Sequence, residues 1–190
     1  MTLTYPMPNR PRPATLPGDR TGAADVARMI RVDQAGELGA KAIYQGQMAV
    51  LGRHPSAPLL AEMAAQEAEH LAVFDRLVVE RGVRPSALSP LWRAAGYALG
   101  AGGALLGARA AMATTVAVEE VIEDHYREQL DRLGEDEAGL RATIAEFRED
   151  ELKHRDTALQ NGAEDAPAYQ ILSCGVKAGA RLAIWLAERV

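Results

Sequence analysis

The feature that most constrains the fold is a helical pattern over residues 60–77 whose apolar side is interrupted by one glutamate and one histidine. Spacings of three and four residues place one set of side chains on a single helical face, namely Leu60, Met63, Phe74 and Leu77. Glu67 and His70 complete that face. Because an unpaired ionised carboxylate in a core costs roughly several kcal/mol, this face is either solvated or bound to a metal.

A second stretch, residues 140–158, repeats the anomaly. Its apolar stripe comprises Leu140, Ile144, Phe147 and Ala158. Glu151 and His154 interrupt this stripe, again with the spacing Glu-x-x-His, so two of the 4 histidines lie in this arrangement. A single such pair is usually a surface feature. Two pairs in line with apolar stripes indicate a shared polar site in the core.

Two further helical stripes each carry a glutamate at a core-facing position and a tyrosine seven residues later. Glu37 and Tyr44 lie in the first stripe, which also includes Asp33, and Glu119 and Tyr126 lie in the other. The two glutamates are separated by 82 residues, as are the two tyrosines, and the two Glu-x-x-His motifs are separated by 84. The chain therefore contains an internal repeat of two helix pairs.

A glutamate from each of two helices and a Glu-x-x-His motif from each of two others form the dinuclear iron or manganese site of ferritin-like four-helix bundles. Four carboxylates balance the charge of two divalent ions, so the site can be buried as a neutral unit. Oxygen-rich ligation with one imidazole per metal favours iron or manganese over zinc. We assign Glu37 and Glu119 as terminal ligands, Glu67 and Glu151 as bridges, and His70 and His154 as one ligand to each metal.

The sequence thus predicts an all-α fold, a ferritin-like four-helix bundle with two additional apolar helices that face a membrane. Glycine and proline breaks bound the bundle helices at residues 24–51, 57–80, 110–133 and 138–159. The apolar run at residues 94–108 connects the two halves and suits a long crossover. At 190 residues, the chain accommodates one domain with a full core.

The two additional helices come from stretches without acidic residues. Residues 81–118 contain none, and the uncharged run within them makes about 22 Å of helix, less than the roughly 30 Å of a hydrocarbon core. Trp92, Tyr97 and flanking arginines favour a position on a membrane surface. Burial in the bundle or in a dimer interface is an equally good alternative. The last helix, predicted over 168–189, is acid-free up to its final turn and suits the same membrane surface.

Composition limits the remaining classes of protein. The net charge of -5 is modest and does not indicate a nucleic-acid partner. Residues 1–22 contain five of the 10 prolines, which predicts a disordered arm without a secretory signal, ahead of a ferritin-like di-iron domain at 23–190. Cys174 is the only cysteine, so one chain supplies neither a disulfide nor a cysteine-based metal site.

Other residues are assigned lesser roles. His125 and Tyr126 are a candidate relay of protons or electrons, although a histidine is more often a surface residue. Tyr44 and Tyr126 either lie beside the metals or fill the core. Glu120 and Glu123 are candidate acids beside the metal ligands, although solvated side chains are the more common case. His54 and Cys174 are expected to be structural.

Six segments carry a resemblance to a known family. They are RVDQAGELGAKAIYQGQMAVLG (31–52), QEAEH (66–70), TVAVEEVIEDHY (115–126), FREDELKH (147–154), APAYQIL (166–172) and AGARLAIWLAER (178–189). In these motifs the chain resembles the demethoxyubiquinone hydroxylases of ubiquinone biosynthesis, in the same order over about residues 25–190. Gln34 departs from the histidine of many relatives, at a position that is not a metal ligand in the family.

The resemblance implies a peripheral membrane monooxygenase with two iron ions per chain. It would hydroxylate the ring of a demethoxyubiquinol, a polyprenyl quinol, with O2 as co-substrate and with NADH as the source of electrons. The family's six iron ligands fall on the six residues assigned above. An enzyme on the membrane surface can take in the ring while the tail stays in lipid. The expected location is the cytoplasmic face of a bacterial cell membrane, or the matrix face of the mitochondrial inner membrane in a eukaryote.

Two other classes of protein remain open. A soluble ferroxidase or peroxide-scavenging bundle would use the same ligands but would not need an acid-free apolar surface. A metal-free helical membrane adaptor would leave the six core-facing residues unexplained. The expected partners are the quinol and the membrane surface. A lipid-binding or biosynthetic-complex protein and a second copy of the chain in a homo-oligomer are further candidates, and the sequence leaves both open. Tail length and electron route stay open.

Overall fold

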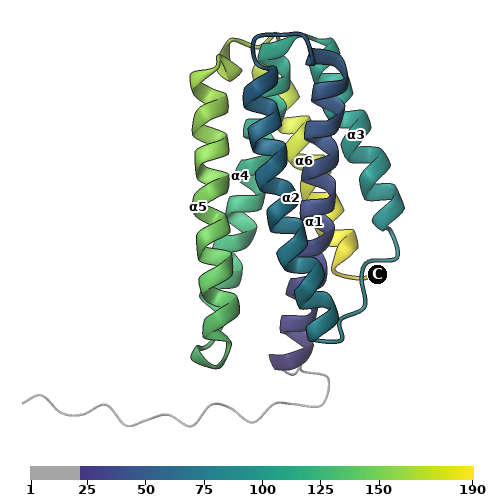
Figure 1. Ribbon diagram of the computed structural model, residues 1–190, viewed down its shortest axis with the longest axis vertical. Coiled ribbons are helices and arrows are strands. Elements are labelled where there is room, and N and C mark those ends of the chain that lie inside the picture. Colours follow the sequence, from purple (N-terminus) through teal and green to yellow (C-terminus); the bar gives the residue numbers. More distant parts are fainter. Residues whose placement is uncertain (1–21) are drawn as a thin grey trace, which may run out of the picture.

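The computed structural model describes residues 22–190, and within them six α-helices form an all-α, ferritin-like bundle (Figure 1). The helices are α1 (Gly22–Leu51), α2 (Ala57–Glu80), α3 (Ser89–Leu105), α4 (Ala108–Arg132), α5 (Ala138–Gln160) and α6 (Tyr169–Ala187), with short 3-10 turns η1 (Glu135–Glu137) and η2 (Ala163–Asp165). The predicted fold class is confirmed. The predicted arm, apart from its last position, lies outside the described residues.

Glycine and proline set the helix boundaries. Proline occupies the first turn of both α2 and α3, where its missing N–H costs no hydrogen bond. Gly82 follows α2 with a φ of 60°, a left-handed conformation that ends a helix and that glycine adopts without a steric penalty. Gly107, with a φ of 112°, lies in the turn between α3 and α4. Most of the apolar run at 94–108 therefore belongs to α3, which begins before the run and ends at Leu105. The bounds predicted for the other helices agree to within two residues.

The helices pack as two antiparallel pairs with two further helices beside them. α1 pairs with α2 and α4 pairs with α5, while α3 packs along α1 and α6 packs along α4 (Figure 1). α3 also contacts α4. The crossover that links the two repeats is therefore helix α3, which packs on the outside of the four-helix bundle. None of the helices within residues 22–190 is long and apolar enough to cross a membrane.

Helix α3 docks on α1 through glycines. A Cβ at Gly100 would lie 1.9 Å from the carbonyl oxygen of Ile43, and one at Gly46 would lie 2.2 Å from that of Tyr97. This approach of backbone to backbone buries one face of α3 and leaves Tyr97 46% exposed on the other. The interfacial role predicted for Trp92 is wrong, because this side chain is buried and its Nε1–H donates to Ser86 Oγ at 3.2 Å.

Two apolar clusters fill the ends of the bundle. One includes Leu60, Met63 and Met112, and the other includes Ile30 and Phe74. Between them lies a layer of buried acidic, imidazole and amide side chains. The apolar ends therefore separate this polar layer from solvent. In such a low-dielectric environment, unpaired charges in the layer would strongly destabilise the fold.

Candidate metal centre

The six predicted ligand residues meet in the polar layer of the bundle. α1 and α4 supply one glutamate each, and α2 and α5 supply one Glu-x-x-His motif each. None of the six is more than 3% exposed: Glu37, Glu67, His70, Glu119, Glu151 and His154. The i, i+3 spacing of each motif places its glutamate and histidine on the same helical face, as the periodicity predicts.

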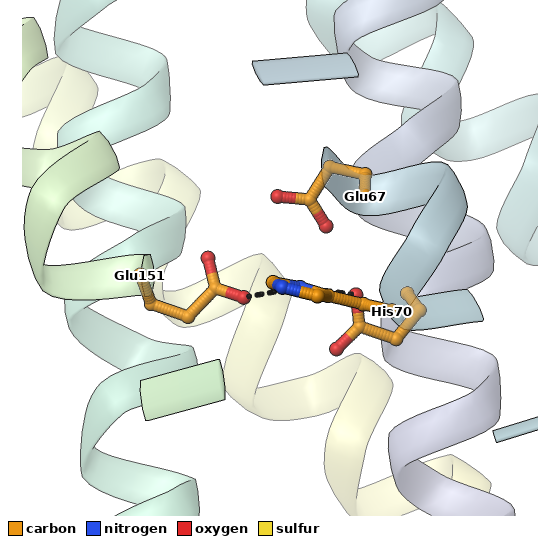
Figure 2. A group of neighbouring side chains, drawn as sticks. Glu67, His70 and Glu151 are labelled. Carbon is orange, nitrogen blue, oxygen red and sulfur yellow. Dashed lines mark ion pairs between the residues drawn. The ribbon is translucent and has the colours of Figure 1, made fainter. Parts of the chain in front are cut away.

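These residues form two overlapping groups whose potential ligand atoms lie within 4.8 Å of one another. Glu37 and His70 belong to the first group, Glu119 and His154 to the second, and Glu67 and Glu151 to both. Figure 2 shows Glu151 reaching from α5 toward His70 and Glu67 on α2. The arrangement can hold two cations side by side, with two carboxylates shared between them.

Eight side-chain atoms at the centre have no hydrogen-bond partner within the described chain. They are one carboxylate oxygen each of Glu37 and Glu119, both oxygens of Glu67 and of Glu151, and the Nδ1 atoms of His70 and His154. A buried polar atom without a partner carries a desolvation penalty of about 1–3 kcal/mol, and more when charged. The donor set therefore fits metal ions, which would satisfy all eight atoms at once.

The titration behaviour without a metal reflects the same crowding. Burial raises the pKa of Glu67 and of Glu119 well above the usual carboxyl range, and repulsion from the Glu151 carboxylate adds to both rises. Burial lowers the pKa of His70, but the adjacent Glu151 and Glu37 outweigh burial and raise it to about 10. In the metal-free protein, protons and an imidazolium thus take the place of cations.

The two histidines present equivalent atoms to the centre. His70 Nδ1 lies 3.3 Å from a Glu151 oxygen, and His154 Nδ1 lies 3.3 Å from the other Glu151 oxygen. Their Nε2 atoms point outward, His70 to Asp150 at 3.4 Å and His154 to Gln66 at 2.7 Å. An acceptor on the outer nitrogen holds the proton there and leaves the inner nitrogen free to bind a metal.

Two tyrosines brace the terminal glutamates across the repeat. Tyr44 of α1 donates to Glu119 of α4 at 2.7 Å, and Tyr126 of α4 donates to Glu37 of α1. Both tyrosines are fully buried. They are therefore hydrogen-bond partners of the candidate ligands and also belong to the two apolar clusters of the core, so both predicted roles are found.

Two glutamines that the sequence pattern did not single out extend this bracing. Gln129 Nε2 donates to Asp33 Oδ1 at 2.6 Å, and Gln47 Nε2 donates to Thr115 Oγ1 at 3.2 Å. Residues 47 and 129, like 33 and 115, are separated by the same 82 residues as the two glutamates. Extending the repeat along α1 and α4 would have identified them. His125 is partly buried, with Nε2 3.3 Å from Asp33 Oδ1, and is not a free surface residue.

An apolar cavity of about 340 Å³ lies against the helices that carry the terminal glutamates. Its walls come from α1, α3, α4 and α6, and include Gly36 and Val118, the residues that precede Glu37 and Glu119 in the sequence. All twenty lining residues are apolar or glycine. The volume falls in the range of small-molecule sites, about 300–1,000 Å³.

Four other residues singled out in the sequence lie outside the six candidate ligands, and their contacts are as follows. Glu123 is buried, and Arg148 Nε donates to it at 2.8 Å, so the prediction of a solvated side chain is wrong. Glu120 is partly exposed and pairs with Lys177 of α6. Gln34 donates to Asp75 Oδ1 at 2.9 Å, joining α1 to α2. His54 is exposed in the α1–α2 loop and contacts Ser56.

Comparison with known proteins agrees with the geometry. The model of the family described as ubiquinone biosynthesis protein COQ7 matches residues 24–187. A 3-demethoxyubiquinol 3-hydroxylase of Rhodospirillum rubrum is 59% identical over 176 residues, which cover 92% of this chain and 83% of the relative. The human NADPH-dependent 3-demethoxyubiquinone 3-hydroxylase, mitochondrial, is 50% identical over 176 residues, which cover 90% of this chain and 81% of the relative. The yeast 5-demethoxyubiquinone hydroxylase, mitochondrial, is 45% identical over 185 residues, which cover 88% of this chain and 79% of the relative. The chain therefore belongs to the family of the ubiquinone biosynthesis protein COQ7.

Proposed function

We propose that this chain is an O2-dependent monooxygenase that binds two iron ions and hydroxylates the ring of a demethoxyubiquinol in ubiquinone biosynthesis. Hydroxylation in this pathway agrees with the names of the relatives from a bacterium, human and yeast. The iron ions, their ligands and the membrane location rest on the chain's own residues.

The observation that carries the proposal is the set of eight buried atoms that make no hydrogen bond, on six residues that form two overlapping groups of potential ligands. Two divalent ions would neutralise four buried carboxylates, which otherwise repel one another at this distance. Glu37 and Glu119, each in one group, would be terminal ligands. Glu67 and Glu151, which belong to both groups, would be bridges, and each histidine would bind one metal through Nδ1.

Bound iron would supply the means of activating O2 at the quinol ring. The chain's own residues prepare the site for it. Tyr44 and Tyr126 hold Glu119 and Glu37 in place through their hydroxyl groups. The apolar clusters at both ends of the bundle exclude water from the reacting groups.

The apolar cavity is the proposed binding site for the quinol ring. Its walls flank Glu37 and Glu119, and their lack of polar groups suits a substrate whose tail is hydrocarbon. A Cβ at Gly36 would meet no atom within 4 Å, so the room at this position belongs to the cavity. A ferroxidase has no need of such a cavity, which favours the hydroxylase over that alternative.

The substitution Gly36→Leu tests this assignment, because the new side chain would occupy the cavity without touching a ligand atom. We expect kcat/KM for the quinol to fall at least tenfold while both metal ions stay bound. Gly139→Leu on α5 is the matched control, since a Cβ there also meets nothing within 4 Å. Unchanged kcat/KM in the Gly36 variant would remove the cavity from the proposal.

His125 and Tyr126 are proposed to relay protons or electrons toward the centre. Tyr126 contacts Glu37, and the ring centroids of His125 and Tyr126 are 6.4 Å apart. His125 in turn contacts Asp33 and is partly exposed, which gives this side of the centre a polar connection to solvent. The proposed donor of electrons is a reduced nicotinamide. NADH is our expectation, and the human relative's name states NADPH, so both belong in the assay.

The proposed membrane surface consists of the outer faces of α3 and α6. Large apolar side chains are exposed on both helices, namely Leu91, Tyr97, Leu105, Ile171, Leu182 and Trp185. These two helices also form walls of the cavity, so the proposed path of the quinol runs from lipid through the cavity toward the centre. The proposed location is the cytoplasmic face of a bacterial membrane, or the matrix face of the mitochondrial inner membrane. Flotation with liposomes tests membrane binding, and a protein that stays in the aqueous phase would contradict it.

Elemental analysis of the purified chain, combined with quinone analysis of cells lacking it, tests the function as a whole. We expect about two irons per chain and accumulation of the demethoxy quinone. Glu37→Ala and Glu151→Ala should lose iron and turnover together, and either variant with full turnover and both irons would refute the ligand assignment. Iron without quinone accumulation would indicate a ferroxidase, and no bound metal would refute the dinuclear site.

A further inference from the structure

The internal repeat includes the residue that precedes each Glu-x-x-His motif. Gln66 and Asp150 are separated by 84 residues, the same interval as the motifs. Each lies against the outer Nε2 of the histidine from the other motif, Asp150 against His70 and Gln66 against His154. The two positions thus perform the same task in the two halves of the centre, but one is a carboxylate and the other a neutral amide.

The same imbalance occurs at a second pair of repeat positions. Asp33 lies one helical turn before Glu37, whereas its counterpart one turn before Glu119 is Thr115. Both side chains are buried, and each accepts a hydrogen bond from the glutamine of the opposite helix. Both acidic members therefore lie on the side of Glu37 and His70, and both neutral members lie on the side of Glu119 and His154.

An acidic acceptor does more than orient an imidazole. Either acceptor fixes the proton on Nε2, but a carboxylate also increases the basicity of Nδ1 and adds negative charge near a bound cation. Asp150 is itself held in place by Lys153, whose Nζ lies 2.7 Å from its other oxygen. Because Lys153 is mostly exposed, its charge is screened by solvent and only partly offsets that of Asp150.

We propose that Asp150 and Gln66 are positioning residues that make the two metal positions inequivalent, so that the position beside His70 and Glu37 binds a divalent ion first and more tightly. This inference rests on the dinuclear site of the proposed function. It adds that the two halves, which match in all six ligands, differ in the residues behind them. The charge of Asp150 is the main cause of the difference.

Titration of the metal-free full chain with Co²⁺, followed by its visible absorption, measures the two steps directly. The wild type should bind in two steps that differ by about tenfold or more in affinity. Asp150→Asn keeps the size of the side chain and should weaken the first step by about tenfold, leaving the second unchanged. Gln66→Glu should strengthen the second step toward the first. Asp156→Asn, at an exposed position on the same helix, is the matched control and should leave both steps unchanged.

The outcomes separate this inference from the function on which it rests. No Co²⁺ binding by the wild type would refute the dinuclear site itself. Two steps of equal affinity, or two steps that neither Asp150→Asn nor Gln66→Glu changes, would overturn the inference and leave the dinuclear site intact. Circular dichroism checks that each variant is folded. If Asp150→Asn loses its helical signal, Gln66→Glu decides the result, because an unchanged second step in that variant also overturns the inference.

Discussion

Replacing Gly100 with alanine should destabilise the protein, although alanine is the better helix former. The added Cβ would lie 1.9 Å from the carbonyl oxygen of Ile43 on α1. Neighbouring helices tolerate carbon–oxygen contacts of about 3.3 Å, so α3 must move away from α1 by roughly 1.4 Å at this point. The obstructing atom belongs to the backbone, and no change of rotamer can relieve the contact.

The expected magnitude combines two opposing effects. Overpacking typically lowers the free energy of unfolding by about 1–3 kcal/mol. The upper value applies because a gap of about 0.5–1 Å between α3 and α1 already removes about a quarter to a half of the energy of each dispersion contact along their interface. The helix propensity of alanine returns about 1 kcal/mol. Gly100→Ala should therefore lower the free energy of unfolding by about 2 kcal/mol.

Gly102→Ala on the same helix is the matched control. A Cβ at Gly102 would meet no atom within 4 Å, so this variant should gain about 1 kcal/mol from helix propensity alone. Unfolding in urea, followed by circular dichroism, should separate the two variants by about 3 kcal/mol, which corresponds to about 6–12 °C in Tm for a chain of this length. If the two variants had equal stability, glycine would not be needed for the α1–α3 packing.

Two further predictions concern the centre. Metal-free protein should lose stability as the pH rises from about 6 to about 9, measured by urea unfolding at both values. The pKa of His70 is raised to about 10, so protonation of His70 stabilises the folded state fully below the ordinary pKa of histidine, and this stabilisation is lost as the pH approaches 10. The raised pKa values of Glu67 and Glu119 change stability in the same direction. Higher stability at the higher pH would contradict this sign. Tyr44→Phe and Tyr126→Phe should each weaken one step of Co²⁺ binding by about tenfold, and wild-type binding in both variants would show that the hydroxyl groups do not position the glutamates.

The helices and the six candidate ligand residues could be predicted because their signals are local and strong. Periodicity with glycine and proline breaks determines where a helix begins and ends. A carboxylate within an apolar stripe is costly enough to demand an explanation. Glu67 and Glu151 illustrate the point, since each lies in line with core residues and is fully buried in the structure.

Features that depend on the relative placement of helices could not be predicted in this way. Trp92 lies on an amphipathic helix, and composition does not reveal which face of such a helix docks on its neighbours. Glu123 appeared solvated because its partner, Arg148, is on another helix. The cavity is the space left between four helices, so its lining and size depend on how these helices pack and not on a local pattern.

The bracing of the centre explains why the two repeats must fold as one unit. Buried hydrogen bonds between α1 and α4 link one repeat to the other, as with Tyr44 to Glu119 and Tyr126 to Glu37. A single helix pair would expose its glutamates without a tyrosine to hold them, and its histidine without an outer acceptor, because Asp150 and Gln66 also act across the repeat. The two helix pairs must therefore pack together before the side chains of the centre are held in place. Because the outer acceptor of each histidine lies on a helix of the other repeat, we expect a substitution at Asp150 to act on His70 and one at Gln66 to act on His154.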